Sequence, residues 1–377
     1  MIDSREKAAP ASAQPQETGK DTGTEKQTEA RSTNAGRKAL RAVKVIAIAV
    51  CAVLVAAALG AALYVNGKLN KLNYHEQAEP LTHEEVQALS DPALDQSVQK
   101  LERRESAAAP AEGDVFENQD IINILVCGTD MRQPNTKDLG RCDAAVIVSL
   151  NRKTGGVKLI GFERSIGVPT PGEWDTKLNN AFNYGGGAYM QEVLSKCFLV
   201  DLAGYVHLSY DTIAQVFDAI GGIDVELDSS EVYHISEFVK YEPDKPHLQV
   251  GMNNLRGWAA YGYCRLRDAD DNYARQRRVR NALQAALGKV KTMSVAELDA
   301  MANEVLPLIG TNLTKAQISS LILQAPKFKN AVIEQMSVPE KGDGWSYQSG
   351  RGEYMLGLDF SEWSRKIQDF ILEKDSK

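Results

Sequence analysis

Cysteine and histidine are both scarce in this chain of 377 residues, which contains five of each. No two cysteines form a C-x-x-C pair, so the sequence predicts neither a zinc site nor a disulfide framework. Cys51 lies in an apolar run and Cys127 at the end of an expected strand, where packing is the expected role. Cys142 and Cys264 lie inside charged motifs, and for these two a disulfide or a reactive thiol stays open.

Net positive charge is also missing, because 43 Lys and Arg stand against 50 Asp and Glu, a formal net charge of -7. A general nucleic-acid binder would carry a basic domain, so no nucleic-acid partner is expected and any basic function must be local. The hydrophobic fraction of 43% is ordinary for a folded protein. Composition therefore excludes neither an enzyme nor a binding module.

Large apolar side chains are nearly absent from residues 1–36, which we expect to form a disordered cytoplasmic tail. An uncharged apolar run then extends from Val45 to Val65, and a helix of that length spans about 30 Å, the thickness of a bilayer's hydrocarbon core. We therefore expect a transmembrane signal-anchor helix within residues 37–66, with a cleaved signal peptide as the alternative. Lys and Arg are more numerous before the run than after it. This bias predicts a single-pass cell-membrane protein with a cytoplasmic N-terminus and an extracellular C-terminal domain.

Residues 67–114 are polar and end in an Ala- and Pro-containing run, which is typical of a stalk or linker. Residues 115–377 are expected to form one domain, in which short β-rich runs alternate with helical patterns joined by both tight turns and longer crossovers. This mixture predicts an α/β fold, with a mixed β-sheet and helices packed on its faces. The expected strands are Ile121–Cys127, Ala144–Leu150, Val157–Phe162, Gly204–Ser209 and Gly222–Leu227. The expected helices are Gly187–Leu199, Asp211–Ile220, Val295–Ile309, Lys315–Ala325 and Phe360–Leu372, with another beginning near Asn272.

The stretch from Tyr263 to Arg280 packs together six arginines and three aspartates. Clustered arginines repel each other unless an anion lies among them. The alternation around Cys264 to Arg267 predicts a strand that points Arg265 and Arg267 to one face, where paired guanidiniums suit phosphate oxygens. The alternative is a structural network in which the neighbouring aspartates neutralise the arginines.

A helix is predicted from Asn272, and its apolar stripe sorts the remaining arginines. Arg275 is expected on the core side with Arg278 beside it, which makes both candidates for one anion site. Arg277 falls on the far face and Arg280 on the opposite flank, so we expect both outside the site and in contact with solvent.

Five further charged positions lie near the ends of the expected strands. Asp130 and Asp143 lie at a strand end and a strand start across one loop, with Arg141 between them, an arrangement that suits a hard cation with oxygen ligands. The alternative is a capped turn and a surface ion pair. Arg164 follows the strand Val157–Phe162, and Lys177 precedes a Gly-rich segment that could present backbone N–H groups to an anion.

In this order, seven motifs resemble the LytR-CpsA-Psr family of membrane-anchored cell-wall glycopolymer ligases. They are I-N-I-L-V-C-G-T-D-M-R, G-R-C-D-A-A-V-I-V-S-L, E-R-S, K-L-N-N-A-F-N-Y-G-G, F-D-A-I-G-G-I-D-V, L-R-G-W-A-A-Y-G-Y-C-R-L-R and N-Y-A-R-Q-R-R-V-R. The resemblance implies a Mg²⁺-dependent phosphotransferase that transfers a glycan phosphate from a polyprenyl-pyrophosphate carrier to peptidoglycan. It also implies an apolar groove for the lipid tail of the carrier, and membrane lipid as a partner.

The resemblance also implies roles for individual residues. Asp130 and Asp143 would hold the metal, Lys177, Arg275 and Arg278 would bind the pyrophosphate, and the catalytic cations would be Arg141, Arg164, Arg265 and Arg267.

This sequence departs from the family pattern at three positions. Ser165 follows Arg164 where an aspartate is usual, Val279 follows Arg278 where glutamine is usual, and Asn272 replaces an aspartate. A missing acid leaves the arginines less neutralised, which favours anion binding but weakens proton abstraction from an acceptor hydroxyl. Two alternatives to a ligase therefore remain: a non-catalytic protein that binds the lipid-linked glycan, and a lipid pyrophosphate hydrolase that uses water as the acceptor.

Overall fold

The computed structural model describes residues 64–74, 110–130, 139–169, 175–266, 271–349 and 352–373. The chain divides into two units, Met1–Tyr64 and Val65–Lys377, and the second contains the sheet and its helices. The predicted tail (1–36) and nearly all of the predicted anchor (37–66) lie outside the described residues. Within the described ranges, no helix has the length and apolar character needed to cross a bilayer.

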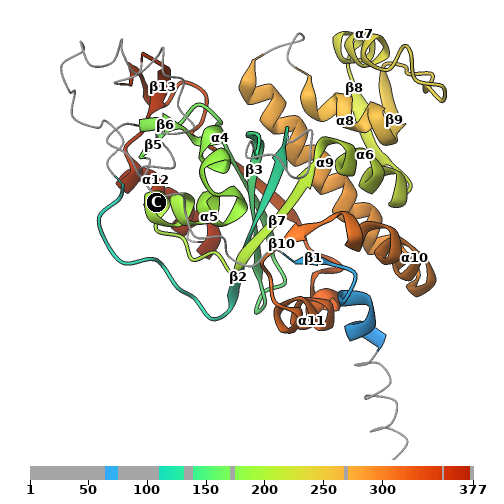
Figure 1. Ribbon diagram of the computed structural model, residues 1–377, viewed down its shortest axis with the longest axis horizontal. Helices are drawn as coiled ribbons and strands as arrows, with labels where there is room; N and C mark the ends of the chain where they lie inside the picture. Colours follow the sequence, from blue (N-terminus) through green and yellow to red (C-terminus); the bar gives the residue numbers. More distant parts are fainter. Residues whose placement is uncertain are drawn as a thin grey trace, which may run out of the picture. The chain divides into compact units, whose positions relative to one another are not determined.

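A seven-stranded mixed sheet occupies the centre of the second unit, in the order β1-β10-β7-β2-β3-β4-β11 (Figure 1). Strand β3 is antiparallel to both β2 and β4, whereas β7 is parallel to β2 and β11 is parallel to β4. The central strands of this sheet are rich in apolar and β-branched residues, as is typical of strands covered on both faces. In sheet order the strands are β1 (Asn73–Tyr74), β10 (Gly310–Thr311), β7 (Gly204–Ser209), β2 (Ile121–Thr129), β3 (Cys142–Asn151), β4 (Val157–Phe162) and β11 (Ile333–Val338).

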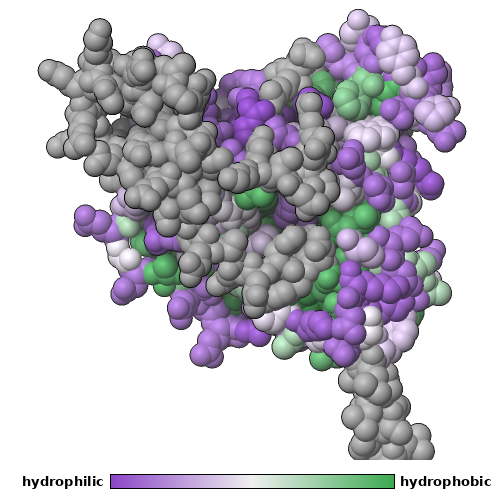
Figure 2. Space-filling model, viewed as in Figure 1, coloured by the Kyte–Doolittle hydropathy of each residue, from purple (hydrophilic) through white to green (hydrophobic). Residues whose placement is uncertain are grey.

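Helices cover both faces of this sheet (Figure 1). On one face α4 (Leu178–Ala181), α5 (Gly186–Phe198) and α12 (Phe360–Leu372) share a hydrophobic cluster with β2, β3 and β4. On the other face α6 (Tyr210–Ala219) and α9 (Asn272–Thr292) contact the sheet. The coloured residues on the face seen in Figure 2 are mostly hydrophilic, as expected when helices turn their apolar sides inward.

A second hydrophobic cluster lies beyond α6 and α9. It is built from α6, α9, α7 (Ser229–Phe238), α8 (Gly257–Arg265) and the antiparallel pair β8 (Ile223–Leu227) and β9 (Gly251–Leu255). The other elements are β5 (Gly167–Pro169), β6 (Asp175–Lys177), α10 (Val295–Val305), α11 (Lys315–Gln324), β12 (Trp345–Gln348) and β13 (Tyr354–Gly357).

The predicted mixed sheet with helices on its faces is confirmed. Strands Val157–Phe162 and Gly204–Ser209 begin and end where the sequence pattern places them, and β3 and β4 form the predicted hairpin. The C-terminal region completes the same domain, because β11 extends the sheet and α12 packs against α5.

The prediction of a stalk over residues 67–114 is wrong at its N-terminal end, because this part packs into the domain. Leu69 is 2% exposed, the Lys68 ammonium lies 2.6 Å from the Asp299 carboxylate, and β1 pairs with β10. Two leucines in a polar stretch and a strand of two residues are too short a pattern to reveal a packed element in the sequence. The domain therefore begins well before residue 115.

Candidate functional site

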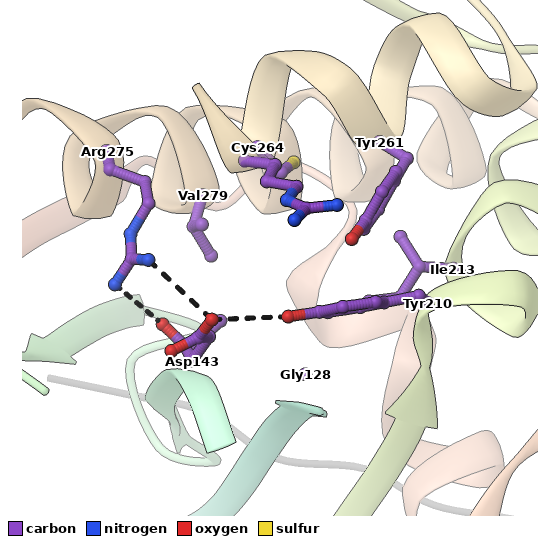
Figure 3. Close-up of a pocket in the computed structure, with 10 residues that line it drawn as sticks. Gly128, Asp143, Tyr210, Ile213, Tyr261, Cys264, Arg275 and Val279 are labelled. Carbon is purple, nitrogen blue, oxygen red and sulfur yellow. Dashed lines mark hydrogen bonds and ion pairs between the residues drawn. The ribbon is translucent and has the colours of Figure 1, made fainter. Parts of the chain in front are cut away.

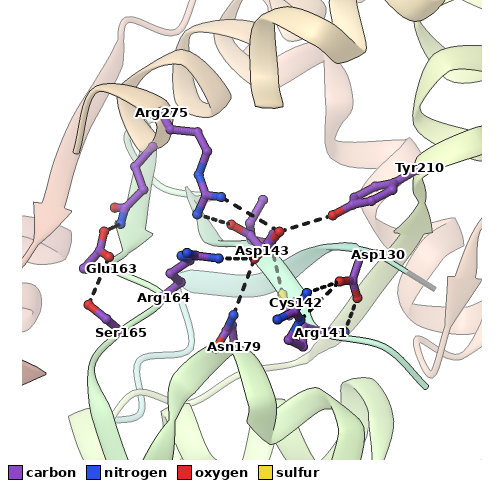
Figure 4. Close-up of polar contacts among 12 residues, drawn as sticks. Asp130, Arg141, Cys142, Asp143, Glu163, Arg164, Ser165, Asn179, Tyr210 and Arg275 are labelled. Carbon is purple, nitrogen blue, oxygen red and sulfur yellow. Dashed lines mark hydrogen bonds and ion pairs between the residues drawn. The ribbon is translucent and has the colours of Figure 1, made fainter. Parts of the chain in front are cut away.

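Four strand ends meet at one edge of the sheet and bring distant polar residues together. Thr129 at the end of β2 is paired with Ser209 at the end of β7 and with Cys142 at the start of β3. Phe162 at the end of β4 is paired with Ala145, near the start of β3. The carboxyl ends of strands are where α/β sheets usually bind ligands. The residues at this edge are Asp130, Asp143, Arg164 and Tyr210 (Figure 4).

Asp143 is the centre of this edge, and donors from several elements surround its carboxylate (Figure 4). Arg164 donates to Oδ1 at 3.0 Å and Asn179 of α4 to the same oxygen at 3.4 Å. The Tyr210 hydroxyl donates to Oδ2 at 3.2 Å. From α9, Arg275 donates to the backbone carbonyl of Asp143 at 3.2 Å, and its Nη1 lies 3.8 Å from Oδ2. An anion that approached Asp143 would therefore meet two guanidiniums already turned toward it.

Asp130 and Arg141 form a second ion pair at the same edge. Nη2 of Arg141 lies 2.9 Å and Nε 3.2 Å from Oδ2 of Asp130, and the backbone N–H of Arg141 donates to Oδ1. The hydrogen bond to Asp130 is the main cause of a raised pKa of Arg141. The Arg141 side chain is 55% exposed, so this pair is accessible from solvent.

Helix α9 sets Arg275 against the sheet. The helix begins at Asn272, where the side chain of Asp271 caps it by accepting from the Ala274 N–H at 3.0 Å. Residues four apart lie on one face of a helix, so Arg275 and Val279 point the same way, and both line the pocket described below. With a side chain 3% exposed, Arg275 lies on the core side of α9, as the sequence predicts.

Glu163 is a buried carboxylate beside these groups. It is 2% exposed and accepts a hydrogen bond from the Ser165 hydroxyl at 3.1 Å (Figure 4). It also accepts one from the side-chain amide of Gln276, the neighbour of Arg275 on α9. Burial raises the pKa of Glu163, while Ser165 and the nearby Arg275 and Arg164 act in the opposite direction.

A pocket with about 360 Å³ of empty space, part of it open to solvent, lies between α6, α8 and α9. Figure 3 shows Asp143 and Arg275 on one side of it and Tyr210, Tyr261 and Ile213 on the other. Most of the lining is aromatic or apolar. The lining residues are Gly128, Asp143, Ala144, Tyr210, Ile213, Tyr261, Cys264, Arg265, Arg275 and Val279.

Two tyrosines form the aromatic wall of the pocket. The ring centroids of Tyr210 and Tyr261 are 4.9 Å apart, and the guanidinium carbon of Arg265 lies 5.7 Å from the Tyr210 ring centroid, within cation–π range. Burial raises the pKa of Tyr261 to about 12 and also raises the pKa of Tyr210. Both phenols therefore keep their protons at neutral pH, and Tyr210 stays a donor to Asp143.

Arg278, which the sequence predicts as a substrate-binding residue, is not brought to this pocket. It is 1% exposed, its Nε donates to Glu231 of α7 at 2.7 Å and its Nη1 to the Leu266 carbonyl at 3.2 Å. The helical projection places Arg278 beside Arg275 correctly, but that flank of α9 faces α7, where a buried carboxylate meets it. Arg278 therefore helps to pack two helices together.

The two arginines expected outside the site differ from each other. Arg277 is exposed, as predicted. Arg280 is 5% exposed, which makes its predicted solvation wrong. Its Nε donates to Gln335 at 3.2 Å and its Nη2 to Ser337 at 2.7 Å, both on β11. The guanidinium lies over Gly161 of β4. A Cβ atom at position 161 would come within 2.6 Å of Nη1, so only a glycine there leaves room for Arg280.

Arg265 is the last residue of helix α8, so the predicted strand over Cys264 to Arg267 is wrong. An alternation over four residues also fits the last turn of a helix. Arg265 nevertheless lines the pocket, whereas Arg267 lies outside the described residues. Lys177 ends β6 and directly precedes α4, which carries Asn179; no described contact joins the Lys177 side chain to Asp143.

Five further site residues escaped the sequence prediction. They are Glu163, Asn179, Tyr210, Tyr261 and Gln276. Four of them belong to motifs that carry the family resemblance: Glu163 to E-R-S, Asn179 to K-L-N-N, Tyr261 to L-R-G-W-A-A-Y and Gln276 to N-Y-A-R-Q. Tyr210 directly follows a correctly predicted strand. By hydropathy alone Tyr261, within an apolar helix, could not be told from a core residue.

Comparison with known proteins gives a consistent result. The sequence model described as the LytR_cpsA_psr family matches residues 74–361, from β1 into α12. The Polyisoprenyl-teichoic acid--peptidoglycan teichoic acid transferase TagU of Bacillus cereus is 24% identical over 267 residues, 70% of this chain and 82% of that protein. The corresponding transferase TagT of Bacillus subtilis is 30% identical over 178 residues, 47% of this chain and 55% of that protein.

Solved structures share the fold. The crystal structure of B. subtilis TagT superposes with a TM-score of 0.53 and 22% identity, covering 68% of this chain and 92% of that one. The LytR-CPS2A-psr family protein YwtF (TagT) with bound octaprenyl pyrophosphate lipid gives a TM-score of 0.51 and 22% identity, covering 72% of this chain and 98% of that one.

Proposed function

The chain belongs to the LytR_cpsA_psr family, and from this premise we propose that it transfers a glycopolymer phosphate from a polyprenyl-pyrophosphate carrier to peptidoglycan in cell-wall assembly. Two relatives are named as teichoic acid transferases, and a protein of the same fold carries octaprenyl pyrophosphate. The observation that carries the proposal is the convergence of Arg164 and Arg275 on Asp143, beside a pocket with mostly aromatic and apolar walls.

Each part of this arrangement matches one part of such a donor. Guanidiniums bind phosphate oxygens with two parallel hydrogen bonds, and Arg164, Arg275 and the exposed Arg141 point to the same sheet edge. The aromatic wall and Ile213 offer an apolar surface to the isoprenoid next to the pyrophosphate. Arg265 lines the same pocket and lies against the Tyr210 ring.

The residues present also fit a Mg²⁺ ion. Mg²⁺ in phosphoryl-transfer sites is usually held by one or two carboxylates together with substrate phosphates. Asp130 and Asp143 would be these carboxylates, because the residues next to them, Thr129 and Cys142, are paired across β2 and β3. The described residues contain no group of three metal-ligating side chains, so phosphate oxygens and water would complete the shell. The ion would supply positive charge to the phosphate oxygens.

The proposed reaction exchanges one P–O bond for another. A hydroxyl of peptidoglycan attacks the phosphorus that carries the glycan, the bond from this phosphorus to the bridging oxygen breaks, and polyprenyl phosphate leaves while the hydroxyl proton is released. Charge grows on the bridging and non-bridging oxygens, so cations fixed around them lower the barrier. Arg141, Arg164, Arg265 and Arg275 would hold these oxygens, with Lys177 nearby.

The proposed location is the outer face of the cell membrane. The apolar run Val45–Val65 would anchor the chain with its N-terminus in the cytoplasm, since Arg37, Lys38, Arg41 and Lys44 precede the run and only Lys68 and Lys71 closely follow it. The domain and the peptidoglycan acceptor would then lie on the same side of the membrane.

The test is transfer by the full-length protein in lipid nanodiscs. The protein is incubated with a polyprenyl-pyrophosphate-linked glycan, Mg²⁺ and peptidoglycan, and both polyprenyl phosphate and labelled peptidoglycan are measured. Formation of both products supports the proposal. Release of polyprenyl phosphate without labelled peptidoglycan would indicate a hydrolase, and binding of the donor without any product would indicate a non-catalytic binding protein.

A further inference from the structure

Glu163 stands out because a buried carboxylate rarely lies unused beside two arginines. It directly follows β4, and its backbone N–H donates to the Val338 carbonyl of β11 at 2.7 Å, which fixes its main chain at the sheet edge. Phe162, one residue earlier, belongs to the hydrophobic cluster on the α5 and α12 face. Side chains alternate along a strand, so Glu163 points to the opposite face, toward α9.

Helix α9 meets the sheet through two adjacent residues that contact two different carboxylates. Arg275 contacts Asp143 of β3, and Gln276 donates to Glu163 after β4. Arg164, the neighbour of Glu163 in sequence, reaches Asp143 at 3.0 Å. Both arginines that converge on Asp143 are therefore linked to Glu163. Arg164 follows Glu163 in sequence, and Arg275 precedes Gln276, which donates to Glu163.

The charges around Asp143 explain why a second carboxylate is needed. Two guanidiniums, the Tyr210 hydroxyl and the Asn179 amide already donate to or approach Asp143. If Asp143 alone balanced both arginines, it would have to stay bound to them when a substrate arrives. Glu163 adjoins Arg164 in sequence and is bonded to Gln276, the neighbour of Arg275, and both arginines favour the charged form of Glu163 by lowering its pKa. A buried charge pair is favourable only when each charge has a partner.

Ser165 completes the arrangement. Its hydroxyl donates to Glu163 at 3.1 Å, so the Glu163 carboxylate lies within one hydrogen bond of the side chain of residue 165. An acid supplied from position 163 can therefore serve the space next to Ser165.

We propose that Glu163 is a positioning residue of the proposed transfer reaction: its buried carboxylate shares the charge of Arg164 and Arg275 with Asp143, which leaves Asp143 able to turn to the substrate side. Glu163 acts through these arginines and through Gln276 and does not line the pocket. The inference rests on the proposed function for its rate effect, but its effect on anion binding does not.

The test compares Glu163→Gln with wild type in the full-length protein in nanodiscs. Glutamine has nearly the same shape, removes the charge and turns one acceptor oxygen into an NH2 donor, whose hydrogen bond the Ser165 hydroxyl can accept. With one negative charge gone beside two arginines, metal-free inorganic pyrophosphate is expected to bind about threefold to tenfold more tightly by calorimetry. The kcat of glycan transfer is expected to fall at least about tenfold, because Asp143 is then held by both arginines.

Three further variants make the test specific. Glu334→Gln changes the same group on β11, where the side chain is 53% exposed, and is expected to alter neither quantity. Glu163→Gln combined with Ser165→Asp returns a carboxylate to the same space, and kcat is expected to recover to within about threefold of wild type. Ser165→Asp alone is expected to bring no gain, since the acid is already present.

The outcomes separate the two proposals. Weaker pyrophosphate binding in Glu163→Gln, an unchanged kcat, a failed rescue by Ser165→Asp, or a gain from Ser165→Asp alone would each overturn the role of Glu163. If wild type transfers no glycan, the proposed function fails, and the pyrophosphate measurement still decides whether Glu163 balances the two arginines.

Discussion

Arg275 contacts Asp143 at two points: its Nη2 donates to the backbone carbonyl at 3.2 Å and its Nη1 lies 3.8 Å from the carboxylate. The first contact is to the main chain and does not depend on where the Asp143 side chain turns. Arg275 therefore stays at the sheet edge when Asp143 moves, and the edge keeps a cation aimed at any incoming phosphate.

Arg275→Lys is expected to weaken binding of a polyprenyl-pyrophosphate analogue by about 10-fold to 100-fold. A lysine keeps the charge but is shorter and lacks the planar fork that lets one nitrogen of Arg275 donate to the carbonyl while the others face an anion. A charge-assisted hydrogen bond contributes about 1.5–3 kcal/mol. The measurement is the Kd by calorimetry. Arg277→Lys makes the same change on the exposed side of α9 and should leave the Kd within about twofold of wild type. Equal losses in both variants would contradict the placement of the site.

The sequence contained enough to predict the sheet edge but not the surroundings of the helix. Asp130, Asp143 and Arg164 lie at strand ends, and strand ends follow from hydrophobic patterning, so their meeting could be predicted. The partners of Arg278 and Arg280 could not. Helical periodicity gives the direction in which each side chain leaves α9 but not which element lies there. Arg278 is buried because it meets Glu231 of α7, and Arg280 is buried because Gly161 of β4 has no side chain in its way.

The same contrast predicts different stability losses for Arg278→Met and Arg280→Met. Removing Arg278 leaves Glu231 buried beside α9 without this partner, and breaking a buried ion pair in this way costs about 3–5 kcal/mol. Arg280 contacts only neutral groups among its described hydrogen bonds, and burial lowers its pKa to about 10. Arg280→Met should therefore cost about 1 kcal/mol or less.

Urea unfolding followed by circular dichroism measures both changes in free energy. Arg278→Met with Glu231→Leu removes both charges and should recover most of the loss. A larger loss for Arg280→Met than for Arg278→Met would show that the Glu231 pair is not the dominant contact of this flank.

Tyr210→Phe tests the aromatic wall of the pocket. It removes the donor to Asp143 at 3.2 Å and keeps the ring that packs against Tyr261. The free energy of unfolding should fall by about 1.5 kcal/mol, the lower end of the contribution of a hydrogen bond to a charged group, because Asp143 keeps Arg164 and Asn179 as donors. The transfer rate should fall about threefold to tenfold, because Asp143 loses one of the groups that orient it. Tyr233→Phe, on an exposed tyrosine of α7, is the control and should change neither quantity.

Glu163→Gln should make the protein more stable at neutral pH, and the advantage should disappear in acid. Burial raises the pKa of Glu163 in the folded state above its usual value of 4.5. Below the pKa of the unfolded chain this carboxyl is neutral in both states, so it imposes no penalty. Between the unfolded and the folded pKa, the unfolded chain has already lost this proton while the folded protein still binds it. Raising the pH through this window therefore lowers the free energy of unfolding. Glutamine does not titrate and avoids this loss.

Urea unfolding of wild type and Glu163→Gln at intervals from pH 4 to pH 8 measures this difference. The variant's advantage should grow with pH and then level off above the folded pKa. Glu334→Gln, on an exposed glutamate, should show no such growth. A difference that shrinks with rising pH would mean that Arg164 and Arg275 outweigh burial and hold the folded pKa of Glu163 below its usual value. The variant would then lose stability and activity together. The charge-sharing role requires the loss of activity in either case, and the pH dependence decides whether burial or the arginines dominate the stability of charged Glu163.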